Sequence, residues 1–471
     1  MNLVTWLLSI ALLWICNLGQ ASARVNYEVR VNANAQVFDI VMCFSGLLPR
    51  LLYAEDSSPL FIRNLRFLGG DDIDSFSWPI KLPRNEDKKC IRYDVFLEPK
   101  TAGAQRGGAE TRLVKESSLL TSVGDWLVRP SSTPTTEKLN IDFFLPEGIY
   151  VSTPWDRVDE DSFIAVNTPI EWQSIVTFSN HPPQAIKVGN GHFELSVMDD
   201  FELLSQEDIQ HWVTLSAQGV ESILGRFPVE RVQIVVAPVR RGNEVVPWAY
   251  ITRGGGAAVH LFVKTSATLD ELPWDWSLPH EMSHFLLPKI KSRETWIIEG
   301  LPTYMQHIAM ASSGQISKNI AWARLHSGFQ KGSKLGGDYS VSEITKQPPR
   351  FGTYLRVYWG GAAYFFNVDA TIRKNSPLSL AEVIRRYHEC CYDPRASVSG
   401  KSLLQKFDSI IGSDIFLRRW KTDIEFSLFP DYESTFETLG LAFLGGNPIV
   451  IDPSNFETGR HIMGQPLNKN N

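Results

Sequence analysis

Two histidines stand one helical turn apart at the start of residues 280–300, which read HEMSHFLLPKIKSRETWIIEG. On a helix, His280 and His284 project from the same face, so both imidazoles can reach one metal ion. Glu281 lies between them, and Glu299 falls on the helix expected next. Two imidazoles and a carboxylate, with a second carboxylate available as a base, form the donor set of a hydrolytic zinc site. We therefore expect Zn²⁺ to be the cofactor.

The spacing also assigns a role to each of these residues. A catalytic zinc site has three protein ligands and one open coordination position. We expect the first helix to stop at Pro288 and the polar turn KIKSRE to reverse the chain. Glu299 would then face His280 and His284 as the third ligand. Glu281 would be the general base that takes a proton from a zinc-activated water.

Hydrolysis also needs a donor for the oxyanion of the transition state. Tyr358, in the segment RVYWGGAAYFF, is the candidate, because Gly360 and Gly361 after it permit close approach of backbone or substrate. Thr303, one turn beyond Glu299, is a candidate hydrogen-bond partner for the ligands. For tyrosines and threonines on helices the ordinary alternative is packing, and the candidates that compete with Tyr358 are Tyr354, Tyr364 and Tyr304.

The composition and the N-terminal sequence limit the classes of protein to which the chain can belong. The chain has 471 residues, 43% of them hydrophobic, which leaves room for two or three domains. A net charge of −6 gives no reason to expect nucleic acid or an anionic membrane as a partner. Residues 1–23 are uncharged, are apolar from Leu3 to Cys16 and close with Ala-Ser-Ala, as in a cleaved secretory signal peptide. We expect an exported protein, periplasmic or secreted, with no stable membrane span after cleavage; a retained signal anchor is the alternative.

Cleavage would leave four cysteines in an oxidising compartment. Cys43 and Cys90 could pair within the N-terminal domain. Cys390 and Cys391 are adjacent, and we expect them to be free thiols. None of the four has the CxxC spacing of a structural zinc site.

The remaining pattern gives the order of domains. Short β-like runs separated by turn residues extend from Val25 to about Gln184 and predict a β-sandwich-like domain. Helical periodicity begins at Glu207–Leu224 and continues at Thr295–Met310, Tyr354–Lys374, Leu378–Glu389 and Ser402–Ile411. The expected division is a signal peptide (1–23), an N-terminal β-domain (24–188), a catalytic domain with a helical lobe (189–430) and a C-terminal segment (431–471) that holds a strand at NPIVI and a polar tail.

HEMSH followed by WIIEGLPTYM resembles the gluzincin metallopeptidases, and within them the glycyl aminopeptidase and aminopeptidase N families. RVYWGGAAYFFNVDATIR is similar to their downstream helix, in which a Tyr followed closely by Gly is the transition-state donor, and the match falls on Tyr358. The resemblance implies a multidomain α+β fold with an N-terminal β-domain, a thermolysin-like catalytic domain and a helical lobe. It also implies a zinc metallopeptidase that acts on a peptide or protein substrate.

Two departures from those families bear on specificity. The gap between His284 and Glu299 is shorter than theirs. They also carry a glycine-rich edge strand with a glutamate that binds the substrate amine. The nearest counterpart, RGGGAAVHLFV at 253–263, has no Glu, and His260 is the only polar side chain of its later half. Gly254–Gly256 could still pair with an extended peptide. Strict aminopeptidase specificity is therefore not expected. The alternatives are a zinc hydrolase of a non-peptide substrate, and a non-catalytic exported binding protein with a structural metal site.

Overall fold

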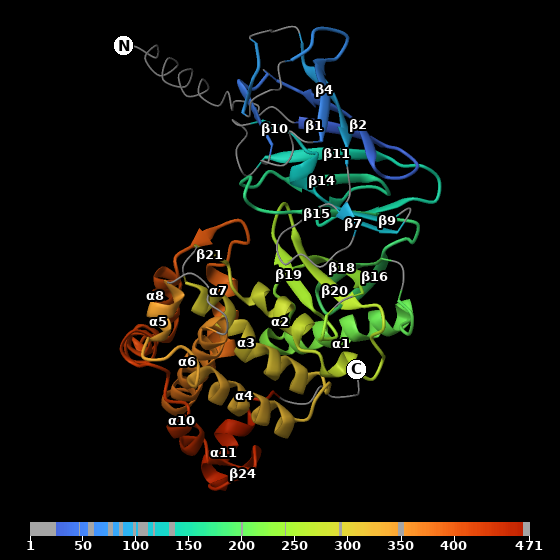
Figure 1. The fold of residues 1–471 in the computed structure, drawn as a ribbon. Helices are drawn as coiled ribbons and strands as arrows, with labels where there is room; N and C mark the ends of the chain where they lie inside the picture. The colour runs from blue at the N-terminus through green and yellow to red at the C-terminus, as the bar shows by residue number, and fades with distance from the viewer. Residues whose placement is uncertain are drawn as a thin grey trace, which may run out of the picture.

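A computed structural model describes most of the chain (Figure 1). The described residues are 25–46, 48–54, 61–73, 79–83, 88–97, 100–101, 112–115, 118–130, 137–198, 201–240, 242–291, 294–346 and 353–464. The predicted signal peptide and the predicted polar tail beyond residue 464 lie outside these ranges. A β-rich domain occupies one end of the molecule, and helices occupy the other, with a second sheet between them.

The N-terminal domain is a sandwich of antiparallel-rich sheets. Its main sheet has the order β13-β14-β11-β1-β2-β6-β4, with β1 and β11 parallel. Every second residue of β1 is buried, as the period of a strand with one covered face requires. The facing sheet has the order β12-β15-β9-β8-β7, and a small third sheet has the order β10-β3-β5. The two large sheets share one core, in which Phe38 and Trp126 pack against Phe143 and Phe178. The predicted β-sandwich-like domain is confirmed.

The strands of this domain have the following bounds: β1 Val25–Val31, β2 Val37–Phe44, β3 Leu51–Tyr53, β4 Ile62–Phe67, β5 Ile80–Lys81, β6 Cys90–Phe96, β7 Lys100–Thr101, β8 Arg112–Lys115, β9 Ser118–Ser122, β10 Arg129–Pro130, β11 Lys138–Phe144, β12 Tyr150–Ser152, β13 Asp156–Arg157, β14 Ser162–Val166 and β15 Ile175–Ser179.

A second, five-stranded sheet lies between the sandwich and the helices. Its order is β16-β17-β18-β20-β19, with β17, β18 and β20 parallel and both edge strands antiparallel. The bounds are β16 Gln184–Val188, β17 Gly191–Val197, β18 Arg231–Val239, β19 Trp248–Thr252 and β20 Ala257–Lys264. β16, which the sequence prediction placed before the boundary at residue 189, pairs with β17 in this sheet.

The two faces of this sheet are covered by different partners. Helix α1 (Gln206–Leu224) packs on one face; it begins with a capping box of Ser205 and Asp208 and ends at Gly225, whose φ of 73° only glycine adopts readily. On the other face, Val235 and Phe262 share an apolar cluster with Leu120 of β9 and Ile175 of β15. The sandwich therefore rests directly on the sheet (Figure 1).

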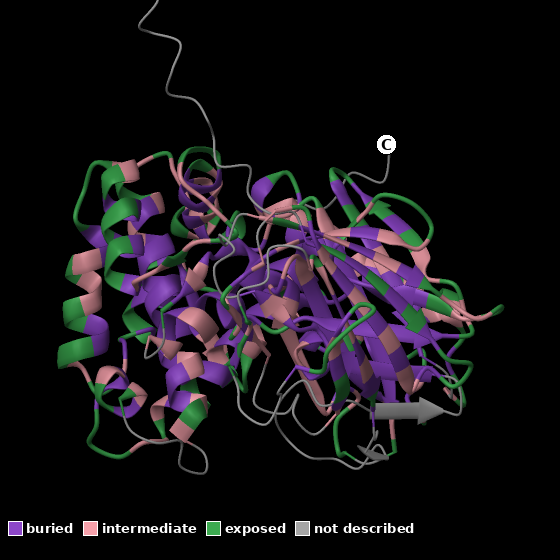
Figure 2. Ribbon diagram, turned by 90° about the horizontal axis from the view of Figure 1, so that it is seen from above, coloured by how far each residue is buried: buried purple, intermediate pink, exposed green. Residues whose placement is uncertain are grey.

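The rest of the chain is mostly helical. The bounds are α2 Ser277–Ser283, η4 His284–Leu286, α3 Thr295–Ser312, α4 Lys318–Ser333, α5 Val341–Thr345, α6 Thr353–Asn375, α7 Leu380–Cys390, α8 Gly400–Ile411, α9 Ile415–Arg419, α10 Glu433–Thr438 and α11 Pro453–Arg460, with two small strand pairs, β21 Lys289–Ile290 with β22 Ser397–Val398 and β23 Leu441–Leu444 with β24 Asn447–Val450. The predicted helices and the strand at NPIVI are present, whereas α4, α5, α9, α10 and α11 were not predicted. The helices bury one large core, seen as the purple interior in Figure 2.

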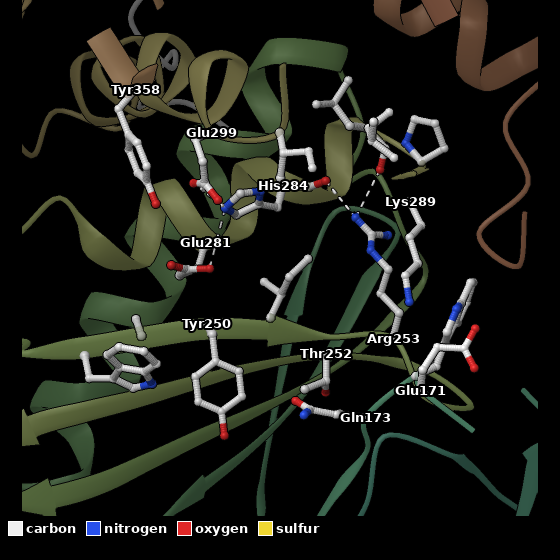
Figure 3. Close-up of a pocket in the computed structure, with 18 residues that line it drawn as sticks. Glu171, Gln173, Tyr250, Thr252, Arg253, Glu281, His284, Lys289, Glu299 and Tyr358 are labelled. Atoms are coloured by element: carbon white, nitrogen blue, oxygen red, sulfur yellow. Dashed lines mark hydrogen bonds and ion pairs between the residues drawn. The ribbon is translucent and has the colours of Figure 1, made fainter. Parts of the chain in front are cut away.

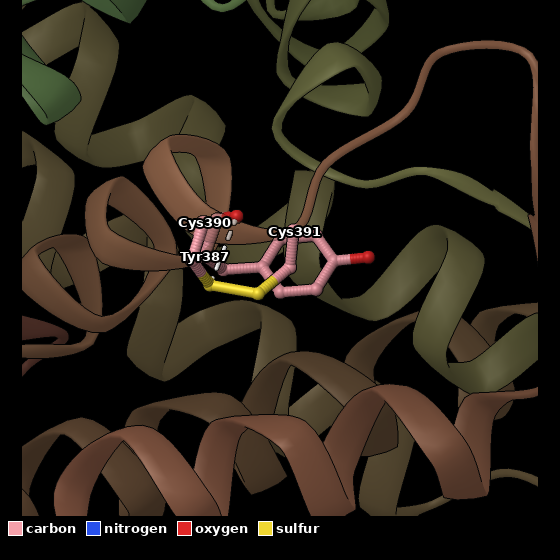
Figure 4. Close-up of a disulfide and its surroundings, with 3 residues drawn as sticks. All are labelled: Tyr387, Cys390 and Cys391. Atoms are coloured by element: carbon pink, nitrogen blue, oxygen red, sulfur yellow. Dashed lines mark hydrogen bonds between the residues drawn. A yellow bond between two sulfur atoms is a disulfide. The ribbon is translucent and has the colours of Figure 1, made fainter. Parts of the chain in front are cut away.

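Both cysteine pairs form disulfides. The pairing of Cys43 with Cys90, which joins β2 to β6, is as predicted. The prediction of free thiols at Cys390 and Cys391 was wrong, since the two form a vicinal disulfide at the end of α7 (Figure 4). Cys391 is the first residue beyond that helix and leaves the helical conformation, which allows its sulfur to meet that of Cys390.

Hydropathy gives one further fact about these helices. Within the described ranges, none of them combines the length and the apolar character needed to cross a bilayer.

Candidate active site

Both predicted imidazoles lie on one face of α2, as their spacing requires. His280 and His284 are buried, with 2% and 8% of their surface exposed, and their ring centroids are 5.0 Å apart. His280 is within the α-helix, whereas His284 is the first residue of the 3₁₀ turn η4 that ends before Pro288. The second imidazole is thus carried by the last turn of the helix.

The predicted third ligand reaches both rings from α3. The Oε2 atom of Glu299 lies 3.3 Å from Nε2 of His280 and 3.6 Å from Nε2 of His284. Ligand atoms about 2.0–2.1 Å from a tetrahedral zinc ion stand roughly 3.3–3.4 Å apart, so the spacing fits zinc. Glu281 Oε2 is farther, 3.8 Å from His284 Nε2. Glu299 is thus the nearer carboxylate, and Glu281 also lies within reach, since its ligand atom and those of His280 and His284 all lie within 4.8 Å of one another.

A residue that the sequence analysis missed orients His280. Oε1 of Gln306 lies 2.7 Å from Nδ1 of His280. An amide oxygen can only accept, so Nδ1 carries the proton and Nε2 keeps its lone pair for a metal. Gln306 follows Glu299 by two helical turns and shares its face of α3, and this spacing was the available sign of its role.

Tyr358 reaches the site because α6 crosses α3 at very close range. A Cβ on Gly361 would lie 2.0 Å from the carbonyl oxygen of Trp296, and one on Gly300 would lie 2.5 Å from the backbone of Gly361. Only glycine permits this crossing. The close approach predicted at Gly361 is therefore made by the backbone of α3. The crossing places the Tyr358 ring nearly parallel to the His280 ring, with the two ring centroids 6.1 Å apart, and brings the Tyr358 hydroxyl beside Glu299.

Burial and neighbouring groups together set the charge of each site residue. Burial raises the pKa of Glu281 to about 7, which suits a base at neutral pH, and lowers the pKa of His284 to about 3, which keeps that ring neutral. It also raises the pKa of Tyr358, with help from the charge of Glu299, so the phenol stays a donor. Burial alone would raise the pKa of Glu299, but the two imidazoles and the tyrosine hydrogen bond bring it below its usual value.

The other candidates take different places. Tyr304 and Tyr364 are core residues that donate to Asp369 and to the carbonyl of Phe416. Tyr354 is 52% exposed and lies beside Tyr358 without lining the cavity at the site. Thr303 is buried on α3, and its hydroxyl makes no hydrogen bond to any described residue, so Gln306 and not Thr303 is the residue that bonds His280.

A cavity of about 450 Å³ opens beside these residues. Figure 3 shows Glu281, Glu299 and Tyr358 gathered about His284 at one end and Lys289 and Glu171 at the other. One wall is β19, the edge strand of the second sheet. The sandwich contributes Glu171, Trp172 and Gln173 to the opposite end of the cavity. No local sequence pattern predicted this contribution.

Residues 253–263, the nearest counterpart of the family's glycine-rich edge strand, do not lie at the edge of the sheet. Residues 254–256 form a turn, and β20, which follows, is an inner strand between β18 and β19. The turn packs against the sandwich, where Gly254 N donates to Gln173 O at 2.9 Å and a Cβ on Gly256 would strike the carbonyl of Pro154. His260 is fully buried and bonds Thr252. The segment that borders the cavity, WAYIT at 248–252, also contains no carboxylate.

The fold is that of solved zinc metallopeptidases. An aminopeptidase N family protein from Idiomarina loihiensis has a TM-score of 0.63 at 13% identity, over 88% of this chain and 78% of that one. An M1 zinc metallopeptidase mutant from Deinococcus radiodurans, bound to a Tyr-Ser-Ala substrate, has a TM-score of 0.52 at 13% identity, over 88% and 97% of the two chains. A two-domain M1 zinc metallopeptidase mutant bound to L-arginine gives 0.52 at 12%, over 87% and 96%.

Sequence comparison adds no match: no family model and no curated protein resembles the chain significantly. The structural likeness confirms the fold that the resemblance of HEMSH and WIIEG implied, a multidomain α+β architecture with an N-terminal β-domain like that of the aminopeptidase N family and M1 metallopeptidase structures.

Proposed function

We propose that this protein is an exported zinc metallopeptidase, with His280, His284 and Glu299 as zinc ligands, Glu281 as general base and Tyr358 as transition-state donor. The observation that carries the proposal is the position of Glu299, whose Oε2 atom lies 3.3 and 3.6 Å from the two imidazole nitrogens, while Oε2 of Glu281 lies farther, 3.8 Å from His284. A site built only for structure would need no free base and would tend to fill its fourth position with protein. Export is proposed from residues 1–23 alone.

The site residues divide the work of hydrolysis. Bound zinc supplies a Lewis acid that lowers the pKa of water and polarises a carbonyl. Glu281 takes a proton from the attacking water, and its pKa of about 7, raised by burial, matches that task. Tyr358 stays protonated and donates to the oxygen on which negative charge grows. Gln306 holds His280 in the tautomer that presents Nε2.

The cavity wall supports an extended peptide as the substrate. β19 is the last strand of its sheet, and one side of it borders the cavity. The backbone of an edge strand can pair with an added extended chain, which would lie across the zinc site. No carboxylate stands on β19 to hold a free amine, and Glu171 at the far end lies near the cation of Lys289. We therefore propose that cleavage does not require a free N-terminus.

A test of the function begins with Glu281→Gln. Because the amide keeps the shape of the side chain but cannot take a proton, we expect zinc content to stay at the wild-type level and hydrolysis of a quenched fluorescent peptide library to fall at least 100-fold. Glu221→Gln, a half-buried carboxylate on α1 that does not line the cavity, is the matched control. Equal turnover by Glu281→Gln and wild type would overturn the mechanism.

The same library, with free and acetylated N-termini, tests specificity. We expect both forms to be cleaved with similar kcat/KM. Cleavage confined to free N-termini would instead make the protein an aminopeptidase, and Glu171 would be the first residue to examine. Peptide binding without hydrolysis in the wild type would contradict the proposal of an enzyme.

A further inference from the structure

The helix that carries the two imidazoles ends immediately after the second one. α2 stops at Ser283, and η4 adds one tight turn from His284 to Leu286 before Pro288 prevents continuation. The last carbonyls of a helix have no partners within it. Here those carbonyls belong to a proposed metal ligand and its neighbours in a buried region, so their partners affect where His284 stands.

Arg253 provides donors for this helix end. Its Nη2 atom donates to the carbonyl of His284 at 2.8 Å and to the carbonyl of Leu287 at 3.0 Å. The guanidinium also lies 5.3 Å from the centre of the Phe285 ring. Figure 3 shows the guanidinium of Arg253, one of the residues that line the cavity, with both of these bonds drawn. A cation at this position also complements the negative end of the helix dipole.

A second support for the helix end comes from His388 and Tyr392, at the end of α7. Nε2 of His388 lies 3.0 Å from the carbonyl of Leu286. Tyr392 stacks on His388, with ring centroids 4.1 Å apart, and its hydroxyl accepts from Nη1 of Arg253 at 3.4 Å. Arg253 is therefore bonded both to the helix end and to Tyr392.

Arg253 is also the residue that follows β19, the strand that borders the cavity. We propose that Arg253 is a positioning residue: it fixes His284 for metal binding and sets the separation between the zinc site and the edge strand along which substrate lies. The inference rests on the proposed function for the identity of metal and substrate. Arginine suits the role because its planar fork bonds several acceptors together, which a lysine ammonium on a flexible stem does less well.

Removal of the Arg253 guanidinium should first weaken metal binding. Arg253→Met leaves the carbonyls of His284 and Leu287 without their donor, and the turn that holds the ligand loosens. Partners that orient metal ligands commonly change metal affinity 10–100-fold when lost. We expect the zinc Kd of Arg253→Met, measured by equilibrium competition with a chelator, to rise at least 10-fold. Arg253→Lys should recover part of the loss.

Arg231→Met is the matched control. Arg231 lies on β18 of the same sheet and is bonded to Glu194, whereas Arg253 is bonded to the carbonyls of the helix end. Its loss should leave the zinc Kd within twofold of wild type. A zinc Kd within twofold of wild type in a folded Arg253→Met protein would overturn the inference, as would equal weakening by Arg231→Met.

Two further readouts separate this inference from the proposed function. In zinc-free protein, we expect amide hydrogen exchange of residues 284–287 to accelerate at least 10-fold in Arg253→Met, a result that needs neither zinc nor substrate; unchanged exchange would count against Arg253. At saturating zinc, KM should rise more than kcat falls, because the metal then restrains His284 while the strand separation stays altered. A wild type that binds zinc but cleaves nothing would refute only the peptidase proposal.

Discussion

The Nδ1 atom of His280 lies 2.7 Å from the Oε1 atom of Gln306, and both residues are buried. Gln306 also bonds the ring of His307 at 3.3 Å, so its amide orientation is constrained on both sides. This contact lets a residue of α3 fix the tautomer of His280, a proposed zinc ligand on α2. It makes α3 the element that supplies both a ligand, Glu299, and the support of another ligand.

Loss of this support should weaken metal binding without unfolding the protein. In Gln306→Leu, the Nδ1–H of His280 has no acceptor, and we expect the zinc Kd to rise 10–100-fold. Gln306→Glu keeps an acceptor at the same place and should retain most of the affinity. Chelator competition monitored by a zinc indicator measures both, and equal affinities for the Leu and Glu variants would contradict the assigned tautomer.

The Tyr358 hydroxyl should matter to catalysis and not to the metal. Loss of one oxyanion donor commonly costs about 10²–10³ in kcat. We expect that loss for Tyr358→Phe, with zinc content unchanged. Tyr354→Phe, one turn away on α6 with a 52% exposed ring, is the matched control and should keep its kcat. If Tyr354→Phe shows the loss and Tyr358→Phe does not, the two roles must be exchanged.

Acid should destabilise the second sheet through His260. Burial lowers the pKa of His260 from 6.5 to about 3, so the folded state holds the ring neutral while the unfolded chain takes up a proton below pH 6.5. The stability contributed by the neutral ring is therefore complete above pH 6.5 and is lost as pH falls from 6.5 toward 3. At pH 5 the loss is about 2 kcal/mol, at about 1.4 kcal/mol per pH unit.

His260→Gln removes this titration and keeps a polar group near Thr252, the partner of His260. Between pH 7 and pH 5, denaturant unfolding should therefore show a smaller loss of stability for His260→Gln than for wild type, by about 2 kcal/mol. Parallel losses in the two proteins would mean that His260 does not titrate as its burial implies.

The two disulfides should differ sharply in their effect on stability. Cys43 and Cys90 are 47 residues apart, and a closed loop of that length lowers the entropy of the unfolded chain by an amount worth about 4 kcal/mol. Cys390 and Cys391 are adjacent and close almost no loop. We expect Cys43→Ala/Cys90→Ala to lose several times more unfolding free energy than Cys390→Ala/Cys391→Ala in guanidinium titrations. The reverse order would show that the vicinal pair acts through contacts of the folded state.

Local spacing determined the part of the site that lies on one helix. The i, i+4 separation of His280 and His284 fixes their common face whatever surrounds them, and Pro288 ends the turn wherever it packs. The same local rules located α1, α3 and α6 to within a few residues, because amphipathic periodicity is a property of the segment itself. Tyr358 was a candidate because Gly360 and Gly361 follow it, and its resemblance to a family helix supported the choice.

Tertiary structure decided which segments meet. Glu299 reaches the imidazoles because α3 packs against α2. Tyr358 comes beside Glu299 because α3 and α6 cross at Gly300 and Gly361, a contact between residues far apart in sequence. The edge strand proved to be β19 and not residues 253–263, since strand order depends on pairing across the sheet, and a glycine run reads alike as strand or turn. The bond from Arg253 to the carbonyl of His284 joins a strand end to a helix end, and no spacing along the chain encodes it.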